Sequence, residues 1–300
     1  MKVLVTGAWN CTEEQLNSLQ SMGNKIVFMQ NEADELPCGA IDAEGIICNG
    51  LFLHHDIREF KKLRYIQFTS AGFDRVPMDY VKQHNITIHN ARGVYSVPMA
   101  EFAVCGVLQL LKRSMALMHS QQNHEWKKQR TLGELFGKTV CVVGCGSVGT
   151  EVAKRFSAFG CEIIGVDLYP REDEHYAGMY PLEDMDKAFG RADVVILTLP
   201  LTEQTQYLIN KNMLKTMKQN AILVNIARGK IVKTIDLIEA LQNKQLSGAM
   251  LDVFEEEPLS SDSPLWDMEN VILTPHNSFV GEGNGARLWS VIKNNMEKFQ

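Results

Sequence analysis

The chain has 300 residues, of which 45% are hydrophobic and 22% are charged, a composition typical of folded globular proteins. Its 30 basic and 36 acidic side chains leave a net charge of −6, which disfavours nucleic acid as a partner because sequence-independent binding needs a basic face. No apolar run approaches the ~18–20 residues of a membrane span, so we expect no membrane segment and no signal peptide. Seven cysteines without a CxxC pair predict reduced thiols in a cytoplasmic protein, with neither disulfides nor a metal site.

Short apolar runs alternate with helical patterns from the start of the chain. The first series of expected strands covers residues 2–6, 25–29, 45–48, 65–69 and 86–89. A long helical pattern follows at 97–119, and a polar stretch at 120–130 comes after it. We interpret this helix and the polar stretch as the crossing from one α/β domain into another.

A second series of strands follows, and a last helical pattern at 281–299 closes the chain. The expected strands cover residues 139–143, 162–166, 194–199, 222–226, 248–253 and 271–274. Strands separated by helices indicate βαβ units and parallel sheets. Continuously apolar strands are typical of a sheet that helices cover on both faces. The sequence therefore predicts an α/β protein with two doubly wound parallel-sheet domains.

A glycine-rich motif directly follows the strand at 139–143 and opens an expected helix. Its residues are Gly144-Cys145-Gly146-Ser147-Val148-Gly149. In this context the first glycine permits a tight turn, the second lets the backbone approach a diphosphate, and the third allows close packing of helix and strand. The helix N-terminus then offers N–H groups and a positive dipole end to the anion. The motif predicts a dinucleotide site.

An acidic residue, Asp167, stands at the end of the next strand, 18 residues after Gly149. Its carboxylate can accept hydrogen bonds from the ribose hydroxyls of an adenosine. A 2′-phosphate about 4 Å away would be repelled by about 4 kcal/mol per charge pair at an effective dielectric near 20. The cofactor is therefore expected to be NAD, with NADP less favoured, although the nearby Arg171 could offset part of the repulsion.

Three residues with complementary chemistry come shortly after the last three expected strands: Arg228, Glu257 and His276. Ligand sites of parallel sheets lie off the carboxyl ends of the strands, so all three should reach the edge that carries the glycine turn. A guanidinium pairs with a carboxylate through two hydrogen bonds. An imidazole can donate a proton to a carbonyl oxygen, and a neighbouring carboxylate would stabilise its charged form. Reduction of a 2-oxo acid by hydride needs these groups.

Taken together, these motifs resemble the D-isomer-specific 2-hydroxyacid dehydrogenase family over nearly the whole chain. Besides the glycine turn and Asp167, the matching segments are Leu199-Pro200-Leu201-Thr202 with Thr205, Val224-Asn225-Ile226-Ala227-Arg228-Gly229, Leu251-Asp252-Val253-Phe254-Glu255-Glu256-Glu257-Pro258 and Thr274-Pro275-His276. The resemblance implies a flavodoxin-like substrate domain at 1–93 plus 281–300 and a Rossmann NAD domain at 94–280, with a cleft between them. It also implies a homodimer through the NAD domains.

The resemblance also implies roles for individual residues. Arg228 would bind the substrate, His276 would be the acid/base, and Glu257 would pair with it. Asp252 would contact the nicotinamide end of the cofactor. Backbone N–H groups of Ala71 and Gly72 would hold the substrate carboxylate. Other residues that the resemblance places beside the cofactor are Gly144, Gly146, Ser147, Val148, Gly149, Leu199, Pro200, Thr205, Ile226 and Ala227.

Two segments depart from the family pattern. Phosphoglycerate dehydrogenases carry an Arg-Ser pair for the substrate phosphate where this chain has the uncharged Asn49 and Gly50, and Arg75 and Arg92 remain open as substitutes for that pair. Phe279 stands where the family has a run of small residues.

The sequence therefore predicts an oxidoreductase that transfers a hydride reversibly between NAD(H) and a small 2-oxo or 2-hydroxy acid of D configuration. Glyoxylate, hydroxypyruvate, pyruvate and longer 2-oxo acids all remain open as substrates. Two alternatives also remain open: a phosphoglycerate dehydrogenase acting on 3-phosphoglycerate, and a non-catalytic protein that senses NAD and binds a partner.

Overall fold

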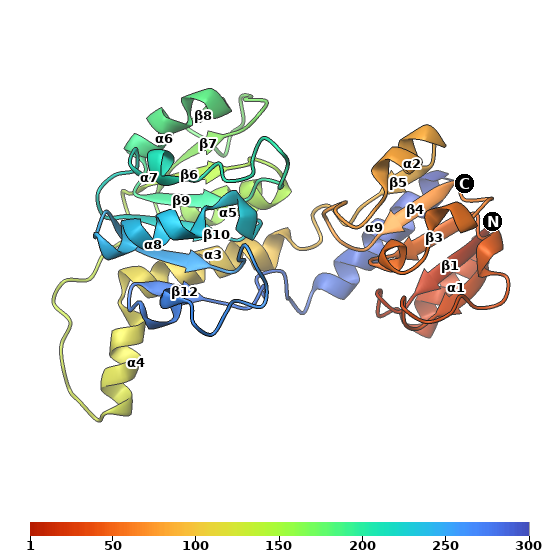
Figure 1. Cartoon of the computed structure of the whole chain (residues 1–300), viewed down its shortest axis with the longest axis horizontal. Coiled ribbons are helices and arrows are strands. Elements are labelled where there is room, and N and C mark those ends of the chain that lie inside the picture. The colour runs from red at the N-terminus through yellow and green to blue at the C-terminus, as the bar shows by residue number, and fades with distance from the viewer. Residues whose placement is uncertain (300) are drawn as a thin grey trace. The chain divides into compact units, whose positions relative to one another are not determined.

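The computed structural model describes residues 1–299, and they form two compact α/β units (Figure 1). Unit 1 comprises Met1–Tyr95 and the C-terminal segment that begins at Gly281, and unit 2 comprises Ser96–Val280. Each unit is built on one parallel sheet, which confirms the predicted fold class. No helix within residues 1–299 is long and apolar enough to cross a membrane.

Unit 1 has a five-stranded sheet in the order β2-β1-β3-β4-β5. Its strands are β1 (Lys2–Thr6), β2 (Lys25–Met29), β3 (Gly45–Cys48), β4 (Tyr65–Phe68) and β5 (Thr87–His89), and its helices are α1 (Glu13–Ser21), α2 (Met78–Gln83) and α9 (Asn284–Phe299). Val3 and Val5 pack with residues of α1 and α9, whereas Leu4 packs in the cluster on the opposite face. Because successive strand residues point to opposite faces, apolar strands of this kind are covered on both sides.

Unit 2 has a seven-stranded sheet in the order β12-β11-β10-β9-β6-β7-β8. Its strands are β6 (Thr139–Val143), β7 (Glu162–Val166), β8 (Gly178–Tyr180), β9 (Val194–Leu197), β10 (Ala221–Asn225), β11 (Leu246–Leu251) and β12 (Val271–Leu273). The strand order reverses between β6 and β9. In sheets of this type, ligands bind off the carboxyl ends of the strands at such a switch point.

The helices of unit 2 cover both faces of its sheet. They are α3 (Ser96–Leu111), α4 (Ser114–Gln122), α5 (Ser147–Ala158), α6 (Met185–Arg191), α7 (Lys211–Leu214) and α8 (Thr234–Gln242). Val140 and Val142 of β6 pack in the cluster with α3 and α5, and Cys141 and Val143 pack in the cluster with α6 and α8. The side chains of residues 140–143 are fully buried on both faces of β6. This close packing fixes the position of the strand that leads into the glycine turn.

Two expectations from the sequence are wrong. The pattern at 97–119 is not one helix, because the chain takes a left-handed turn at Arg113 (φ 50°) between α3 and α4. This stretch is also not the crossing between the domains, because it lies wholly in unit 2, where α3 packs against α5 and the chain changes unit at Tyr95. The edge strand β8 was not predicted, since three residues are too few to give a periodic signal.

We expect the loss of Phe156 to destabilise the protein strongly. Its side chain is fully buried on α5, whereas Phe159 at the end of the same helix is 43% exposed. Phe156→Ala should lower the free energy of unfolding by about 3–5 kcal/mol, because it leaves a cavity in the core. Phe159→Ala, the matched control, should lower it by less than about 1 kcal/mol. Urea denaturation followed by circular dichroism measures both, and equal losses would contradict this packing.

Candidate active site

The glycine motif forms a tight turn between β6 and α5. Gly144 has φ +96°, and a Cβ added there would lie 2.6 Å from the backbone nitrogen of Leu199. A Cβ on Gly149 would lie 2.3 Å from the carbonyl oxygen of Gly144. The Thr198 hydroxyl donates to that same oxygen at 2.7 Å. Only glycine fits at these two positions, so the start of α5 is fixed against the ends of β6 and β9.

The start of α5 is open to solvent. Gly146, the residue that precedes the helix, is exposed, and a Cβ added there would meet no atom within 4 Å. Ser147 and Val148 in the first turn are half-buried. A helix N-terminus combines N–H groups with a positive dipole end. The backbone at Gly146 therefore leaves room for a diphosphate, which is the fit that a dinucleotide requires.

Asp167 directly follows β7 and binds the backbone of this turn. Its Oδ2 accepts a hydrogen bond from the Cys145 N–H at 2.7 Å, and its Oδ1 accepts one from the Tyr169 N–H at 3.1 Å. Arg171 donates to the Cys145 carbonyl oxygen at 2.8 Å and pairs with Asp173 at 3.3 Å. The Arg171 guanidinium is thus tied to the protein by two contacts. Burial raises the pKa of the Cys145 thiol to about 12, so this thiol stays protonated and unreactive.

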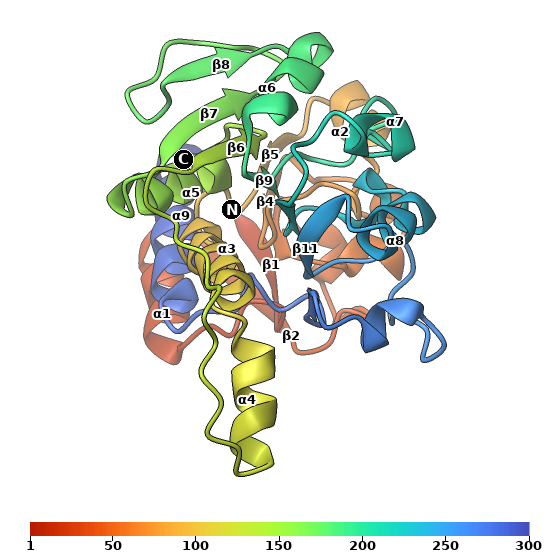
Figure 2. The ribbon, with the colours of Figure 1, turned by 90° about the vertical axis from the view of Figure 1, so that its left-hand side faces the viewer.

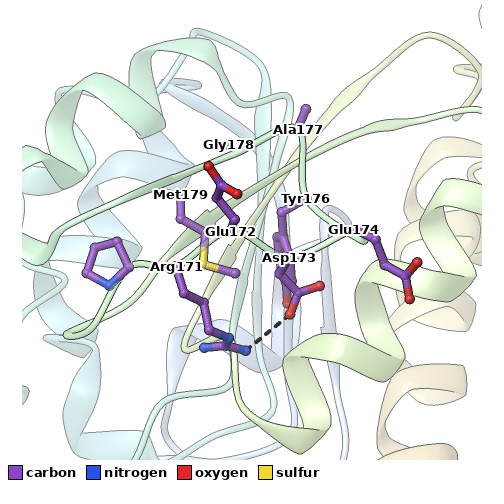
Figure 3. Close-up of a pocket in the computed structure, with 9 residues that line it drawn as sticks. Arg171, Glu172, Asp173, Glu174, Tyr176, Ala177, Gly178 and Met179 are labelled. Atoms are coloured by element: carbon purple, nitrogen blue, oxygen red, sulfur yellow. Dashed lines mark hydrogen bonds and ion pairs between the residues drawn. The ribbon is translucent and has the colours of Figure 1, made fainter.

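A hollow of about 630 Å³ opens beside this end of the sheet (Figure 3). Its lining contains one basic side chain, Arg171, and three acidic ones, Glu172, Asp173 and Glu174. Figure 3 shows Arg171 joined to Asp173 by their ion pair. Because the lining carries a net negative charge, it favours a neutral ribose over a ribose phosphate.

The structure brings His276 and Glu257 together. The His276 Nδ1 lies 2.8 Å from Glu257 Oε2, and Glu257 Oε1 accepts a hydrogen bond from the Phe254 N–H at 3.0 Å. The ring of Phe279 stands edge-on to the imidazole, with ring centroids 6.0 Å apart. The His276 side chain is 42% exposed, so part of the imidazole is accessible to a small molecule.

Asp252 determines the position of His276. Its carboxylate is fully buried and accepts hydrogen bonds from the Thr274 hydroxyl (2.7 Å), the Asn277 N–H (2.7 Å) and the Ser278 N–H (3.0 Å). The His276 N–H donates to the Asp252 carbonyl oxygen at 2.8 Å. Sequence reasoning missed this role, because these partners are more than 20 residues away along the chain. The expected contact of Asp252 with the nicotinamide stays a prediction.

The turn that carries Arg228 lies beside the turn that carries Glu257. Buried Asn225 donates from its side chain to the Arg228 carbonyl oxygen at 3.1 Å and accepts from the Ala227 N–H at 3.1 Å. A Cβ on Gly229 would lie 1.8 Å from the Phe254 carbonyl oxygen, so the two turns are in close contact. Sequence reasoning gave Asn225 no role, although an amide at the end of a buried strand is a usable signal.

The other predicted residues are divided between the two units. Leu199, Ile226 and Ala227 are buried at the ends of β9 and β10, and buried Thr205 donates from its hydroxyl to the Pro200 carbonyl oxygen at 2.7 Å. Ala71 and Gly72 lie in unit 1, in the loop after β4. Within residues 1–299, no group of three or more acidic, histidine or cysteine side chains is placed to hold a metal ion.

Comparisons with known proteins identify the family of the chain. The sequence profile described as "D-isomer specific 2-hydroxyacid dehydrogenase, NAD binding domain" matches residues 104–278. A D-3-phosphoglycerate dehydrogenase of Methanocaldococcus jannaschii is 33% identical over 99% of this chain, which spans 57% of that protein. A glyoxylate reductase of Thermococcus kodakarensis is 34% identical over 80% of this chain and 74% of that protein. A D-lactate dehydrogenase of Aquifex aeolicus, solved with NAD and lactic acid, superimposes with a TM-score of 0.79 at 26% identity, covering 99% of this chain and 95% of that one.

Two glycine substitutions should separate cofactor binding from stability. Gly146→Ala should leave the melting temperature unchanged, because its Cβ meets no protein atom, and should raise the dissociation constant for NADH by at least about tenfold, because the Cβ occupies the space left for the diphosphate. Gly144→Ala should lower both the melting temperature and the affinity. Fluorescence titration and thermal melting measure the two quantities. Unchanged NADH affinity in Gly146→Ala would contradict the assignment of the diphosphate to this helix end.

Proposed function

The chain belongs to the D-isomer-specific 2-hydroxyacid dehydrogenase family, and we propose that it transfers a hydride reversibly between NAD(H) and a small D-2-hydroxy or 2-oxo acid. The observation that carries the proposal is the His276–Glu257 pair, which lies beside the Arg228 turn. Both lie at the carboxyl edge of the sheet that also carries the glycine turn. An acid/base, a carboxylate-binding cation and a dinucleotide turn at one sheet edge are the groups that this reaction needs.

In the proposed mechanism, the Arg228 guanidinium binds the substrate carboxylate, and the N–H groups of Ala71 and Gly72 contribute from unit 1. His276 Nδ1 is engaged by Glu257, so Nε2 is the atom that exchanges a proton with the substrate. During reduction, Nε2 gives this proton to the oxygen of the former carbonyl group, and during oxidation it takes the proton back. A bound nicotinamide supplies the hydride in one direction and accepts it in the other.

The residues around the glycine turn support NAD as the cofactor. We assign the diphosphate to the N-terminus of α5 and the adenosine ribose to Asp167. The carboxylate of Asp167 and the acidic lining of the nearby hollow both disfavour a 2′-phosphate. Arg171, whose guanidinium is already held by Cys145 and Asp173, compensates this charge only in part.

Replacing His276 should abolish most of the activity without affecting cofactor binding. The wild-type protein should oxidise NADH faster than NADPH in the presence of glyoxylate, hydroxypyruvate or pyruvate. His276→Ala should lower turnover by ~10²–10⁴, because the general acid is lost, and should leave NADH affinity nearly unchanged. His84→Ala, on unit 1, is the control and should keep wild-type turnover. Initial rates and NADH titration measure the effects, and wild-type turnover in His276→Ala would refute the assigned role.

We further propose that two copies associate through unit 2 in a reducing cytoplasm. Helix α4 extends away from the sheet of unit 2 (Figures 1 and 2). It carries the exposed apolar side chains Met115, Leu117 and Met118, and the segment that follows carries Trp126 (96% exposed) and Phe136 (80% exposed). Large exposed apolar side chains of this kind are typical of a protein interface. The seven free cysteines support a reducing compartment.

Charges on the apolar side of α4 should dissociate the dimer. The double variant Met115→Glu with Met118→Glu should be monomeric, because two carboxylates would be buried without partners at the interface. The control, Gln219→Glu with Gln242→Glu, adds the same charge at exposed positions of unit 2 outside α4 and should stay dimeric. Light scattering coupled to size-exclusion chromatography gives the mass of each. A wild-type monomer, or a dimeric Met115/Met118 variant, would exclude this interface.

A further inference from the structure

Two neighbouring loops of unit 1 differ in what their backbone N–H groups bind. Residues 49–50 follow β3 and residues 69–72 follow β4, and these two strands are paired in the sheet. The Thr69 N–H donates to the Cys48 carbonyl oxygen at 2.9 Å, so the loops begin side by side. Both lie at the carboxyl edge of the sheet, where N–H groups at strand ends can bind anions.

An internal carboxylate, that of Glu32, already occupies the N–H groups of the first loop. Its Oε1 accepts from the Asn49 N–H at 2.7 Å, and its Oε2 accepts from the Gly50 N–H. The hydroxyl of Thr6, which is fully buried, donates to Oε1 at 2.6 Å and anchors the carboxylate. A Cβ on Gly50 would lie only 3.2 Å from Oε2, so the loop packs closely against this side chain.

The second loop offers its N–H groups to a ligand. Within residues 1–299, the N–H groups of Ala71 and Gly72 have no acceptor. Their carbonyl oxygens are instead turned to the protein, where Ala71 accepts from Asn90 at 2.6 Å and Gly72 accepts from the Ser70 hydroxyl at 3.1 Å. This loop can therefore bind one anionic group, and the adjacent loop presents a fixed negative charge.

We propose that Glu32 makes the protein selective for 2-oxo acids whose only anionic group is the carboxylate beside the carbonyl. This inference rests on the proposed function, with the substrate carboxylate at Ala71 and Gly72. A second anionic group on the substrate, such as a phosphate, sulfonate or carboxylate, would find the N–H groups of Asn49 and Gly50 occupied and would be repelled by Glu32. The accepted substrates are then 2-oxo acids whose substituent on the carbonyl carbon carries no negative charge.

The cation Arg75 contacts the first loop. Its Nη1 donates to the Asn49 side chain at 3.4 Å, which is a long hydrogen bond. Arg75 is exposed, so solvent and salt screen its charge. Glu32 is half-buried and held by three hydrogen bonds, so its charge is fixed in position beside the loop. Of these two charges, the Glu32 carboxylate therefore contributes more to the electric field at residues 49–50.

The test compares hydroxypyruvate with 3-phosphohydroxypyruvate, which differ only by the phosphate. With saturating NADH, the wild-type kcat/KM should favour hydroxypyruvate by at least about a hundredfold, and Glu32→Gln should reduce this ratio by at least about tenfold. Glu35→Gln is the matched control: it removes one exposed negative charge from the same segment and should leave the ratio unchanged. Raising the ionic strength from about 0.05 M to about 0.5 M should lower the wild-type ratio of kcat/KM for hydroxypyruvate to kcat/KM for 3-phosphohydroxypyruvate. This measurement needs no variant.

The outcomes separate the inference from the function on which it rests. A wild-type protein that reduces neither compound, nor any other 2-oxo acid, would overturn the proposed function and the inference with it. A wild-type protein that reduces both compounds equally well would overturn the inference alone. A folded Glu32→Gln variant that keeps the wild-type ratio of the two kcat/KM values would also overturn the inference alone. So would a wild-type ratio that does not change with ionic strength.

Discussion

The buried carboxylate of Asp252 is the constraint on which the catalytic geometry depends. A carboxylate with no exposed surface must have its oxygens satisfied by the protein. All three donors to Asp252 come from the segment that surrounds His276, and its backbone holds the His276 N–H as well. His276 is thereby fixed in a left-handed conformation (φ 51°) that the chain would otherwise leave. Once this backbone is fixed, Glu257 has only to orient the ring.

Carboxylates also bind backbone N–H groups at the ends of other strands. Asp167 binds the Cys145 N–H after β6, and Glu32 binds the N–H groups of Asn49 and Gly50 after β3. Internal carboxylates thus occupy N–H groups at the carboxyl edges of both sheets. Among the described residues, the start of α5 and the loop at Ala71 and Gly72 are two positions with room or N–H groups for an external anion. The proposed selectivity rests on this difference between occupied and available N–H groups.

Local signals made the fold predictable, and long-range contacts limited what could be predicted of the site. Apolar runs placed the strands to within one or two residues, and the glycine motif placed the start of α5. The short strand β8 and the break at Arg113 gave no periodic signal. The roles of Asp252 and Glu32 depend on partners 25 and 17 residues away, respectively, which no pattern along one chain reveals. The residue types at the site were therefore predictable, whereas the contacts that position them were not.

The division between the units also explains why similarity to relatives does not identify the substrate. The matched NAD-binding profile, residues 104–278, lies wholly in unit 2, which carries the glycine turn and the His276–Glu257 pair. Relatives named for phosphoglycerate and for glyoxylate are almost equally similar to this chain, at 33% and 34% identity. The comparisons therefore leave the substrate open, and the segments in which the chain departs from the family pattern are where a difference in substrate choice is to be sought. One such segment is Phe279, beside His276 in unit 2, and the other is the loop at Asn49 and Gly50 in unit 1, where Glu32 supplies the negative charge on which the proposed selectivity rests.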